Sequence, residues 1–233
     1  MEWILQGIRD AILMLLHGDK EVLRITLLTL KVSCTATLIS IFIGIPIGYI
    51  LAFHDFFGRK LIVSMVNLGM GFPPTVVGLW VYILIARNGP LGGLELIYTP
   101  TAIIIAQAVI ASPIVMGFSV AAFQQINSKM KTQILSLGAS PIQLMLLLVR
   151  EARLGLFAAV MAGFGGVISE VGASMMVGGN IKGDTRVLTT AMVMEVNKGN
   201  PEVAIALSVI LLALAYLVVV VLTINQQRGR SIQ

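Results

Sequence analysis

One acidic residue, Glu170, stands in the middle of a long apolar stretch of the sequence. A charge at the centre of a hydrocarbon layer costs about 2.5 kcal/mol or more, so this carboxylate must face protein or water and find a partner. Two interpretations stay open: Glu170 lines a pathway or organises a gate, or it pairs structurally with a backbone N–H or with a cation such as Lys182. If the ligand of this protein were an anion, Glu170 would not contact it directly, because the two negative charges would repel each other.

A group of polar side chains follows Glu170 in what we expect to be a loop. Lys182 and Arg186 are positively charged, and Asn180 and Thr185 are potential hydrogen-bond donors. Such groups can attract an anion or dock a binding protein. The alternative interpretation is an ordinary solvated loop.

The sequence contains no constellation typical of an enzyme or a cofactor site. Cys34 is the only cysteine, and His17 and His54 are far apart, so no metal site is indicated. A nucleophile–base pair and a Gly-x-x-x-x-Gly-Lys-Ser/Thr phosphate loop are both missing. The net charge of +5 comes from scattered basic residues, which argues against nucleic-acid binding. We therefore expect that this chain catalyses no reaction, hydrolyses no ATP and holds no cofactor.

The elements that must position these residues are predicted to lie in a membrane. Hydrophobic residues make up 57% of the chain and charged residues only 12%, about half the charged share of a soluble domain. Four stretches lack Asp, Glu, Lys and Arg, and each is at least as long as the roughly 20 residues that cross a bilayer: 32–53, 61–86, 96–128 and 203–227. We predict an all-α integral membrane protein with five spans, at 25–53, 61–86, 101–123, 154–177 and 203–224.

The first residues differ from these spans. Trp3, Ile4, Ile8, Ile12, Leu15 and Leu16 recur at helical spacing, which predicts an amphipathic helix in the membrane interface. A sixth, poorly formed span is the alternative, and a removable signal peptide is not indicated. We divide the chain into an interfacial helix at 1–20 and a transmembrane domain at 21–227.

Prolines and glycines interrupt the predicted spans. Pro46 lies in the first span, Pro73 and Pro74 in the second and Pro113 in the third, and glycines cluster between 163 and 179. Proline removes a helix hydrogen bond and kinks the helix, whereas glycine permits close helix packing. The cluster as a whole suits a pathway with moving walls, whereas the alternative, favoured for any single residue, is that it only shapes helix packing.

Residues 124–153 form the most polar connection between spans. The run Ser136-Leu137-Gly138-Ala139-Ser140-Pro141 predicts a helix, a sharp turn and a second helix. Gly138 suits a left-handed C-cap, Ser140 suits an N-cap and Pro141 a first helical turn. Such an element can dock into a groove on a soluble partner; the alternative is an ordinary polar loop.

Three segments together resemble a known family. Residues 137–141 resemble the centre of the "EAA" loop of ABC importer permeases. Residues 71–79 resemble the double-proline second span of oxyanion permeases. Residues 170–173 and 179–188 resemble the Glu-x-Gly-Ala and Gly-x-Thr-x-x-Leu stretch of molybdate, sulfate and tungstate permeases. The resemblance covers about 26–224. Thr132-Gln133-Ile134 replaces Glu-Ala-Ala, and Arg150-Glu151 replaces the closing Leu-Pro. With these departures, the chain looks most like the tungstate permeases.

The resemblance implies a type I ABC importer permease core in the cytoplasmic membrane of a prokaryote. It also implies a homodimer, a cytoplasmic ATPase subunit that contacts the turn at 136–141, and an extracytoplasmic substrate-binding protein. Pro73, Pro74, Glu170, Gly172 and Ala173 would then belong to the pathway and gate. Molybdate or sulfate transport stays open as an alternative. A secondary transporter is the other alternative, disfavoured because no internal repeat is found.

Overall fold

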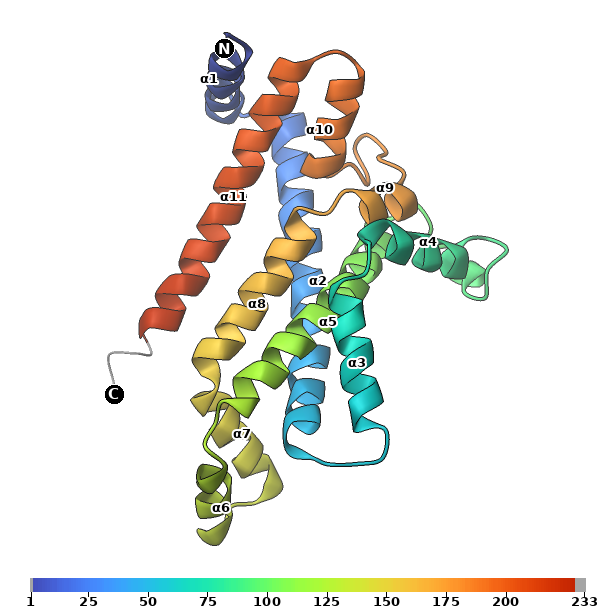
Figure 1. Cartoon of the computed structure of the whole chain (residues 1–233). Helices are drawn as coiled ribbons and strands as arrows, with labels where there is room; N and C mark the ends of the chain where they lie inside the picture. Colours follow the sequence, from blue (N-terminus) through green and yellow to red (C-terminus); the bar gives the residue numbers. More distant parts are fainter. Residues whose placement is uncertain (1, 229–233) are drawn as a thin grey trace.

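The structure is a computed structural model that describes residues 2–228, and that part of the chain is helical without strands. Figure 1 shows a tall bundle. The helices are α1 Glu2–Leu16, α2 Lys20–Phe53, α3 Arg59–Met70, α4 Pro74–Ile85, α5 Pro100–Gln124, α6 Ser128–Ser136, α7 Pro141–Glu151, α8 Arg153–Ile168, α9 Gly172–Gly178, α10 Leu188–Asn197 and α11 Pro201–Arg228, with a short 3₁₀ turn at Gly92–Leu94.

Three helices are long and apolar enough to cross a membrane by themselves. These are α2, α5 and α11, of which α2 is the longest with 34 residues. At 1.5 Å per residue, α2 extends over about 50 Å, well beyond the hydrocarbon thickness. The predicted spans at 25–53, 101–123 and 203–224 are therefore confirmed as long helices.

The second and fourth predicted spans are each broken into two helices. α3 and α4 meet at 105°, and α8 and α9 meet at 59°. The first break follows from Pro73 and Pro74, because neither residue has an N–H and Pro73 adopts an extended backbone before Pro74 opens α4. The predicted span at 61–86 is therefore a bent pair, with the interruption that the prolines predict: α3 runs along the bundle, whereas α4 points away from it (Figure 1).

The N-terminal helix α1 has 15 residues, fewer than the roughly 20 needed to cross a bilayer. It lies beside the beginning of α11 at one end of the molecule (Figure 1). Gly7 makes this approach possible, because a Cβ at that position would lie 2.5 Å from the side chain of Ile205. Its placement in the membrane interface stays a prediction.

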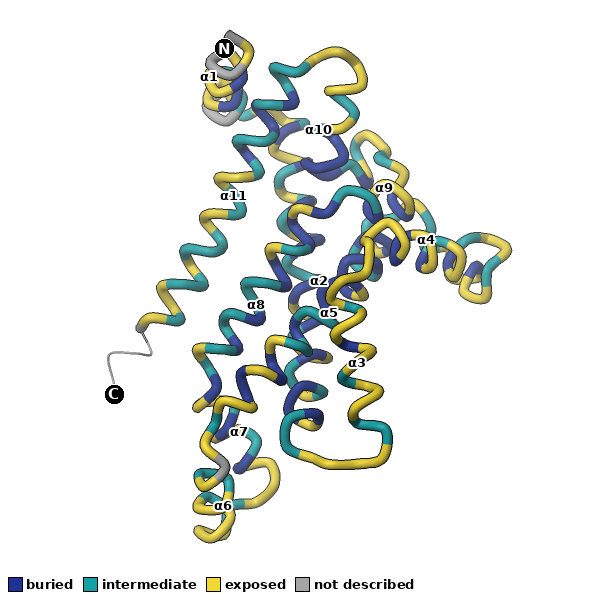
Figure 2. Tube along the Cα trace, viewed as in Figure 1, coloured by how far each residue is buried: buried dark blue, intermediate teal, exposed yellow. Residues whose placement is uncertain are grey.

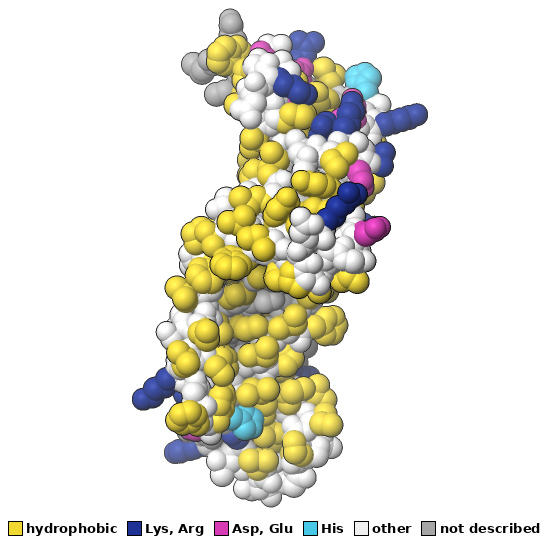
Figure 3. Space-filling view, turned by 90° about the vertical axis from the view of Figure 1, so that its right-hand side faces the viewer, with side chains coloured by type: hydrophobic (Ala, Val, Ile, Leu, Met, Phe, Trp, Pro, Cys, Tyr) yellow, Lys and Arg dark blue, Asp and Glu magenta, His cyan; other side chains and the backbone are white. Residues whose placement is uncertain are grey.

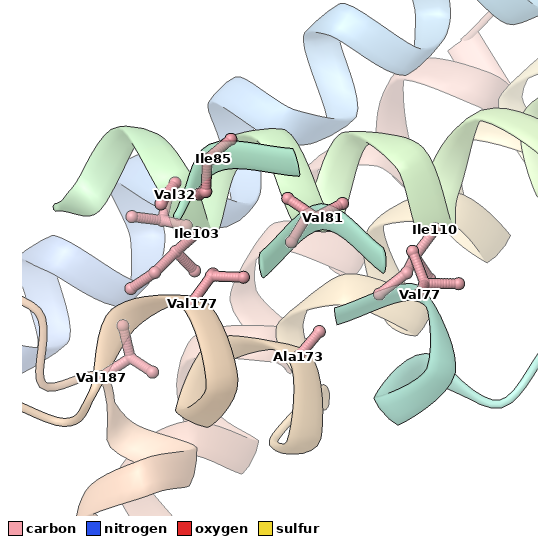
Figure 4. Packing of buried hydrophobic residues seen from close by; sticks show 11 residues of the cluster. Val32, Val77, Val81, Ile85, Ile103, Ile110, Ala173, Val177 and Val187 are labelled. Carbon is pink, nitrogen blue, oxygen red and sulfur yellow. The ribbon is translucent and has the colours of Figure 1, made fainter. Parts of the chain in front are cut away.

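The main hydrophobic cluster joins the two broken helices to the long ones. It combines Val32 of α2, Ile103 and Ile110 of α5, Val77, Val81 and Ile85 of α4, Ala173 and Val177 of α9, and Val187 (Figure 4). Because α4 and α9 share this cluster, the segments after both breaks are fixed against α5.

The outer surface has the polarity of a membrane protein. Buried residues follow the inner sides of α2, α5 and α8 (Figure 2). On the face that Figure 3 shows, apolar side chains cover a broad band of the molecule, while charged side chains lie over the upper part and near the lower end. This distribution matches a hydrocarbon layer around the middle of the bundle.

Candidate functional site

Glu170 lies in the break between α8 and α9, and its side chain caps the N-terminal end of α9. Its side chain is buried, and Oε1 accepts a hydrogen bond from the backbone N–H of Ala173 at 3.0 Å, while Oε2 accepts one from that of Ser174 at 3.1 Å. The first N–H groups of a helix have no partner within it, and a carboxylate there is further stabilised by the helix dipole. The predicted pairing with a backbone N–H is therefore confirmed, whereas pairing with Lys182 is wrong, because that amine binds Glu21.

Other side chains hold the same break from two sides. Nε2 of Gln107, in α5, donates to the carbonyl of Val167 at 3.2 Å and lies 3.4 Å from the hydroxyl of Ser174. The hydroxyl of Thr189, in α10, donates to the carbonyl of Glu170 at 2.8 Å. Sequence reasoning missed Gln107 and Thr189; the signal for Gln107 was an amide in an otherwise apolar span.

The structure brings the two predicted gate segments together. A Cβ on Gly172 would lie 2.3 Å from Cγ2 of Thr75, and a Cβ on Gly78 would lie 2.5 Å from Cα of Ala173. Both glycines are therefore contact points where α4 packs directly on α9. The break that Pro73 and Pro74 cause and the break that Glu170 caps meet at this contact.

The loop at 179–187 is held tightly by its own polar groups. The buried hydroxyl of Thr185 donates to the carbonyl of Gly178 and accepts from the N–H of Ile181. Asn180 has a left-handed backbone with φ 53°, and its carbonyl accepts a hydrogen bond from Arg186. These contacts give Thr185 and Asn180 a structural part in shaping the loop.

Both cations of this loop bind the same carboxylate at the beginning of α2. Nζ of Lys182 lies 2.7 Å from Glu21, and a guanidinium nitrogen of Arg186 lies 3.2 Å from it. Two positive charges share one negative charge, so the trio keeps a net charge of +1. The side chain of Lys182 is 69% exposed and that of Arg186 only 12%, which leaves Lys182 as the accessible member.

The polar connection at 124–153 forms two short helices, α6 and α7, which we call the coupling hairpin (residues 128–151). Gly138 follows α6 with φ +82°, and Ser140 forms a capping box with Gln143 at the beginning of α7. The predicted left-handed glycine, N-cap and first-turn Pro141 are confirmed. Leu137 at the turn is 88% exposed, and Lys129, Thr132, Gln133 and Ser136 line an open groove beside it.

The coupling hairpin and the loop at 179–187 lie at opposite ends of the bundle (Figure 1), and the α4–α9 contact lies between them. Among the described residues, no group of three or more His, Cys, Asp or Glu side chains could hold a metal ion.

Comparison with known proteins decides the family. The pattern of the "Binding-protein-dependent transport system inner membrane component" family matches residues 44–230. This chain belongs to that family. The permease is thus a multi-pass inner-membrane protein, as the long apolar helices indicate.

Relatives of the permease cover most of its length. It is 43% identical to a probable anion ABC transporter permease of Haloferax volcanii, over 82% of this chain and 84% of that one. It is 40% identical to the tungstate uptake permease TupB of Peptoclostridium acidaminophilum (93% and 95% covered) and 36% identical to TupB of Campylobacter jejuni (93% and 90%).

The fold is also found in a solved structure. A chain of the methionine ABC transporter MetNI in an inward-facing conformation superposes with a TM-score of 0.73 at 21% identity, with 92% of the permease and 97% of that chain covered. The expected type I importer core is therefore confirmed as the fold of the permease.

Proposed function

We propose that two copies of this permease form the pathway of an ATP-driven importer whose substrate is the tungstate oxyanion. The observation that carries the substrate is the relationship to two proteins named as tungstate permeases, at 40% and 36% identity over 93% of this chain. Permeases named for molybdenum transport are only 28% identical. Molybdate and sulfate are chemically similar tetrahedral dianions, so the experiment below must separate them.

A second copy of the permease is expected on the face formed by α3 and α4. Leu61, Met65 and Leu68 of α3 are each at least 60% exposed, and so is Trp80 of α4. Phe72 and Val76, on either side of the break at Pro73 and Pro74, are also exposed hydrophobic residues, and Figure 2 shows exposed residues along α3 and around the break. A partner that covers it would enclose the α4–α9 contact between two subunits, and a pathway with two equivalent walls would result.

The ATPase subunit is expected at the turn of the coupling hairpin. Leu137 projects from this turn, and the turn residues 136–141 lie at the far end of the bundle from the loop at 179–187. An exposed leucine that lines an open groove with a mainly apolar surface supports docking against a soluble partner. The extracytoplasmic binding protein would then meet the opposite end, where Lys182 is accessible to acidic groups or to the released anion.

In this proposal, ATP-driven motion of the coupling hairpin alternately opens the pathway to each side. The two helix breaks supply the parts that move, because α4 and α9 are joined to α3 and α8 through short segments that lie outside the helices, 71–73 and 169–171. Glu170 and Gln107 keep the backbone groups at the second break paired. The transported anion undergoes no chemical change.

Element analysis of cells tests the substrate. A strain that lacks this chain and the same strain with the gene restored are supplied with trace tungstate and trace molybdate, and both metals are measured by mass spectrometry. We expect only tungsten to fall in the deletion strain. A fall in both metals would replace tungstate by a broader group of oxyanions, and no change in either would overturn the substrate proposal.

A further inference from the structure

Two basic side chains cap the C-terminal end of α2. The last carbonyl groups of a helix have no partner within it and carry a partial negative charge. Nε of Arg59 donates to the carbonyl of Leu51 at 2.7 Å, and Nζ of Lys131 donates to the carbonyl of Phe53 at 3.3 Å. Arg59 belongs to the following helix, α3, whereas Lys131 comes from α6 of the coupling hairpin, 78 residues along the chain.

Lys131 also contacts the aromatic cluster at this end of α2. Its amine lies 5.4 Å from the centre of the Phe53 ring, within cation–π range. The Phe53 ring lies 5.2 Å from that of Tyr49 and 5.8 Å from that of Phe123, which is fully buried in α5. One side chain of the coupling hairpin therefore contacts the cluster that joins α2 to α5.

The helix α6 presents two different faces. Lys131 and Ile134, three residues apart and therefore on one side of the helix, contact the α2–α5 end through Phe53 and the surrounding cluster. Thr132, Gln133 and Ser136 line the open groove beside Leu137. A partner that binds the groove would act on one face of α6, while Lys131 would pass the displacement on from the other.

The chain connects the coupling hairpin directly to α5 and α8, but not to α2. A displacement of the hairpin reaches α2 only through side-chain contacts, and among the described residues the hydrogen bond from Lys131 to the Phe53 carbonyl is a polar contact of this kind. The opposite end of the same continuous helix carries Glu21, which holds Lys182 and Arg186 of the loop at 179–187. α2 therefore joins the hairpin to the distant loop through one continuous helix, with Pro46 in its interior.

We propose that Lys131 is the positioning residue through which the coupling hairpin moves α2, and with it the far end of the pathway. This inference rests on the proposed function, since it assumes that an ATPase displaces the hairpin. In this proposal Lys131 does not take part in docking the ATPase, because its amine faces the bundle and not the groove. Arginine at this position can still donate to the Phe53 carbonyl and stack on its ring, whereas glutamine loses the charge.

The experiment compares Lys131→Gln, Lys131→Arg and wild type in the full complex with ATPase and binding protein. Lys60→Gln is the matched control, because Lys60 is an exposed lysine in the first turn of α3 and forms none of the ion pairs among the described residues. Tungstate uptake per ATP hydrolysed is measured in proteoliposomes. Hydrogen exchange of the amides at 50–54 is measured in the same complexes, and this second readout needs no substrate.

We expect Lys131→Gln to assemble normally, to exchange faster at 50–54 and to lower uptake per ATP about fivefold or more, the scale of an allosteric coupling. Lys131→Arg should restore both values, and Lys60→Gln should match wild type. Unchanged exchange in Lys131→Gln would overturn the link even if wild type carried no tungstate. Equal loss of assembly, ATP hydrolysis and uptake would also overturn it, because a folding or docking defect has that signature.

Discussion

The carboxylate of Glu170 accepts a hydrogen bond from the backbone N–H of Ala173 at 3.0 Å, within the short segment that separates α8 from α9. An acidic residue in an apolar stretch is thus used to begin a helix in the middle of the bundle. The same carboxylate also accepts hydrogen bonds from the backbone N–H and from the side-chain hydroxyl of Ser174. Its charge is therefore distributed over three donors.

Replacing Glu170 by alanine should disorder the beginning of α9. The N–H groups of Ala173 and Ser174 would lose their acceptor in a buried site, which costs about 2 kcal/mol. We expect a lower melting temperature in detergent and at least a tenfold loss of uptake, about the effect of that free energy on an equilibrium. Glu95→Gln, at an exposed position, is the control; wild-type stability and uptake in Glu170→Ala would contradict the assignment.

Gly172→Ala tests the contact between α4 and α9. Its Cβ would lie 2.3 Å from Cγ2 of Thr75, so the stiff, β-branched Thr75 side chain or the two helices must shift, at a cost of about 1–3 kcal/mol. Adding Thr75→Ala removes that methyl group and should restore stability and uptake. Gly165→Ala is the matched control, because a Cβ there meets nothing within 4 Å; it should stabilise α8 by about 0.5–1 kcal/mol. If the double variant were as unstable and inactive as Gly172→Ala alone, the contact with the Thr75 methyl group would not be the cause of the loss.

Leu137→Gln should weaken binding of the ATPase without destabilising the permease. Leu137 is 88% exposed, so its replacement disturbs no core, yet the loss of an apolar anchor lowers affinity about tenfold or more. Co-purification and titration with the isolated ATPase measure this. Phe57→Gln is a suitable control, since Phe57 is fully exposed in the loop between α2 and α3. Equal affinity of Leu137→Gln and wild type would exclude the turn as the docking point.

Glu195 predicts a pH dependence at the end of α10. Hydrogen bonds from the Asn200 side chain and Lys198 lower the pKa of this carboxyl below its ordinary value. Because the folded pKa is lower than the unfolded one, the stabilisation is present above the unfolded pKa and is lost as the pH falls through the folded pKa. Wild type should therefore melt higher than Glu195→Gln at neutral pH, and the difference should vanish in strong acid. A difference independent of pH would contradict this origin.

The sequence predicts the long apolar helices and an interruption at Pro73 and Pro74, but not the direction of that break, the second break at 169–171 or the separate helix α10. Charge-free runs identify α2, α5 and α11, since only long apolar helices satisfy their backbone in lipid. Pro73 and Pro74 predict an interruption, whereas the 105° turn depends on how α4 packs on α5 and α9. The turn of the coupling hairpin is predictable because its glycine, serine and proline act on the local backbone.

At the candidate site, the sequence could not reveal contacts between residues that lie far apart along the chain. Glu21 and Arg186 pair across 165 positions, and no local pattern indicates such a contact. Gln107 is similar, because its carbonyl partner belongs to Val167 on another helix. The sequence correctly marks Glu170 as a residue that needs a partner, while the choice of Ala173 and Ser174 over Lys182 follows from the fold.

Uptake by purified components tests the central claim most directly. The permease is reconstituted in liposomes with its ATPase and binding protein, supplied with tungstate on the binding-protein side, and internal tungsten is measured with ATP or a non-hydrolysable analogue on the ATPase side. The account predicts accumulation that requires both ATP hydrolysis and the binding protein. Accumulation by the permease alone, driven by an ion gradient without ATPase, would contradict it.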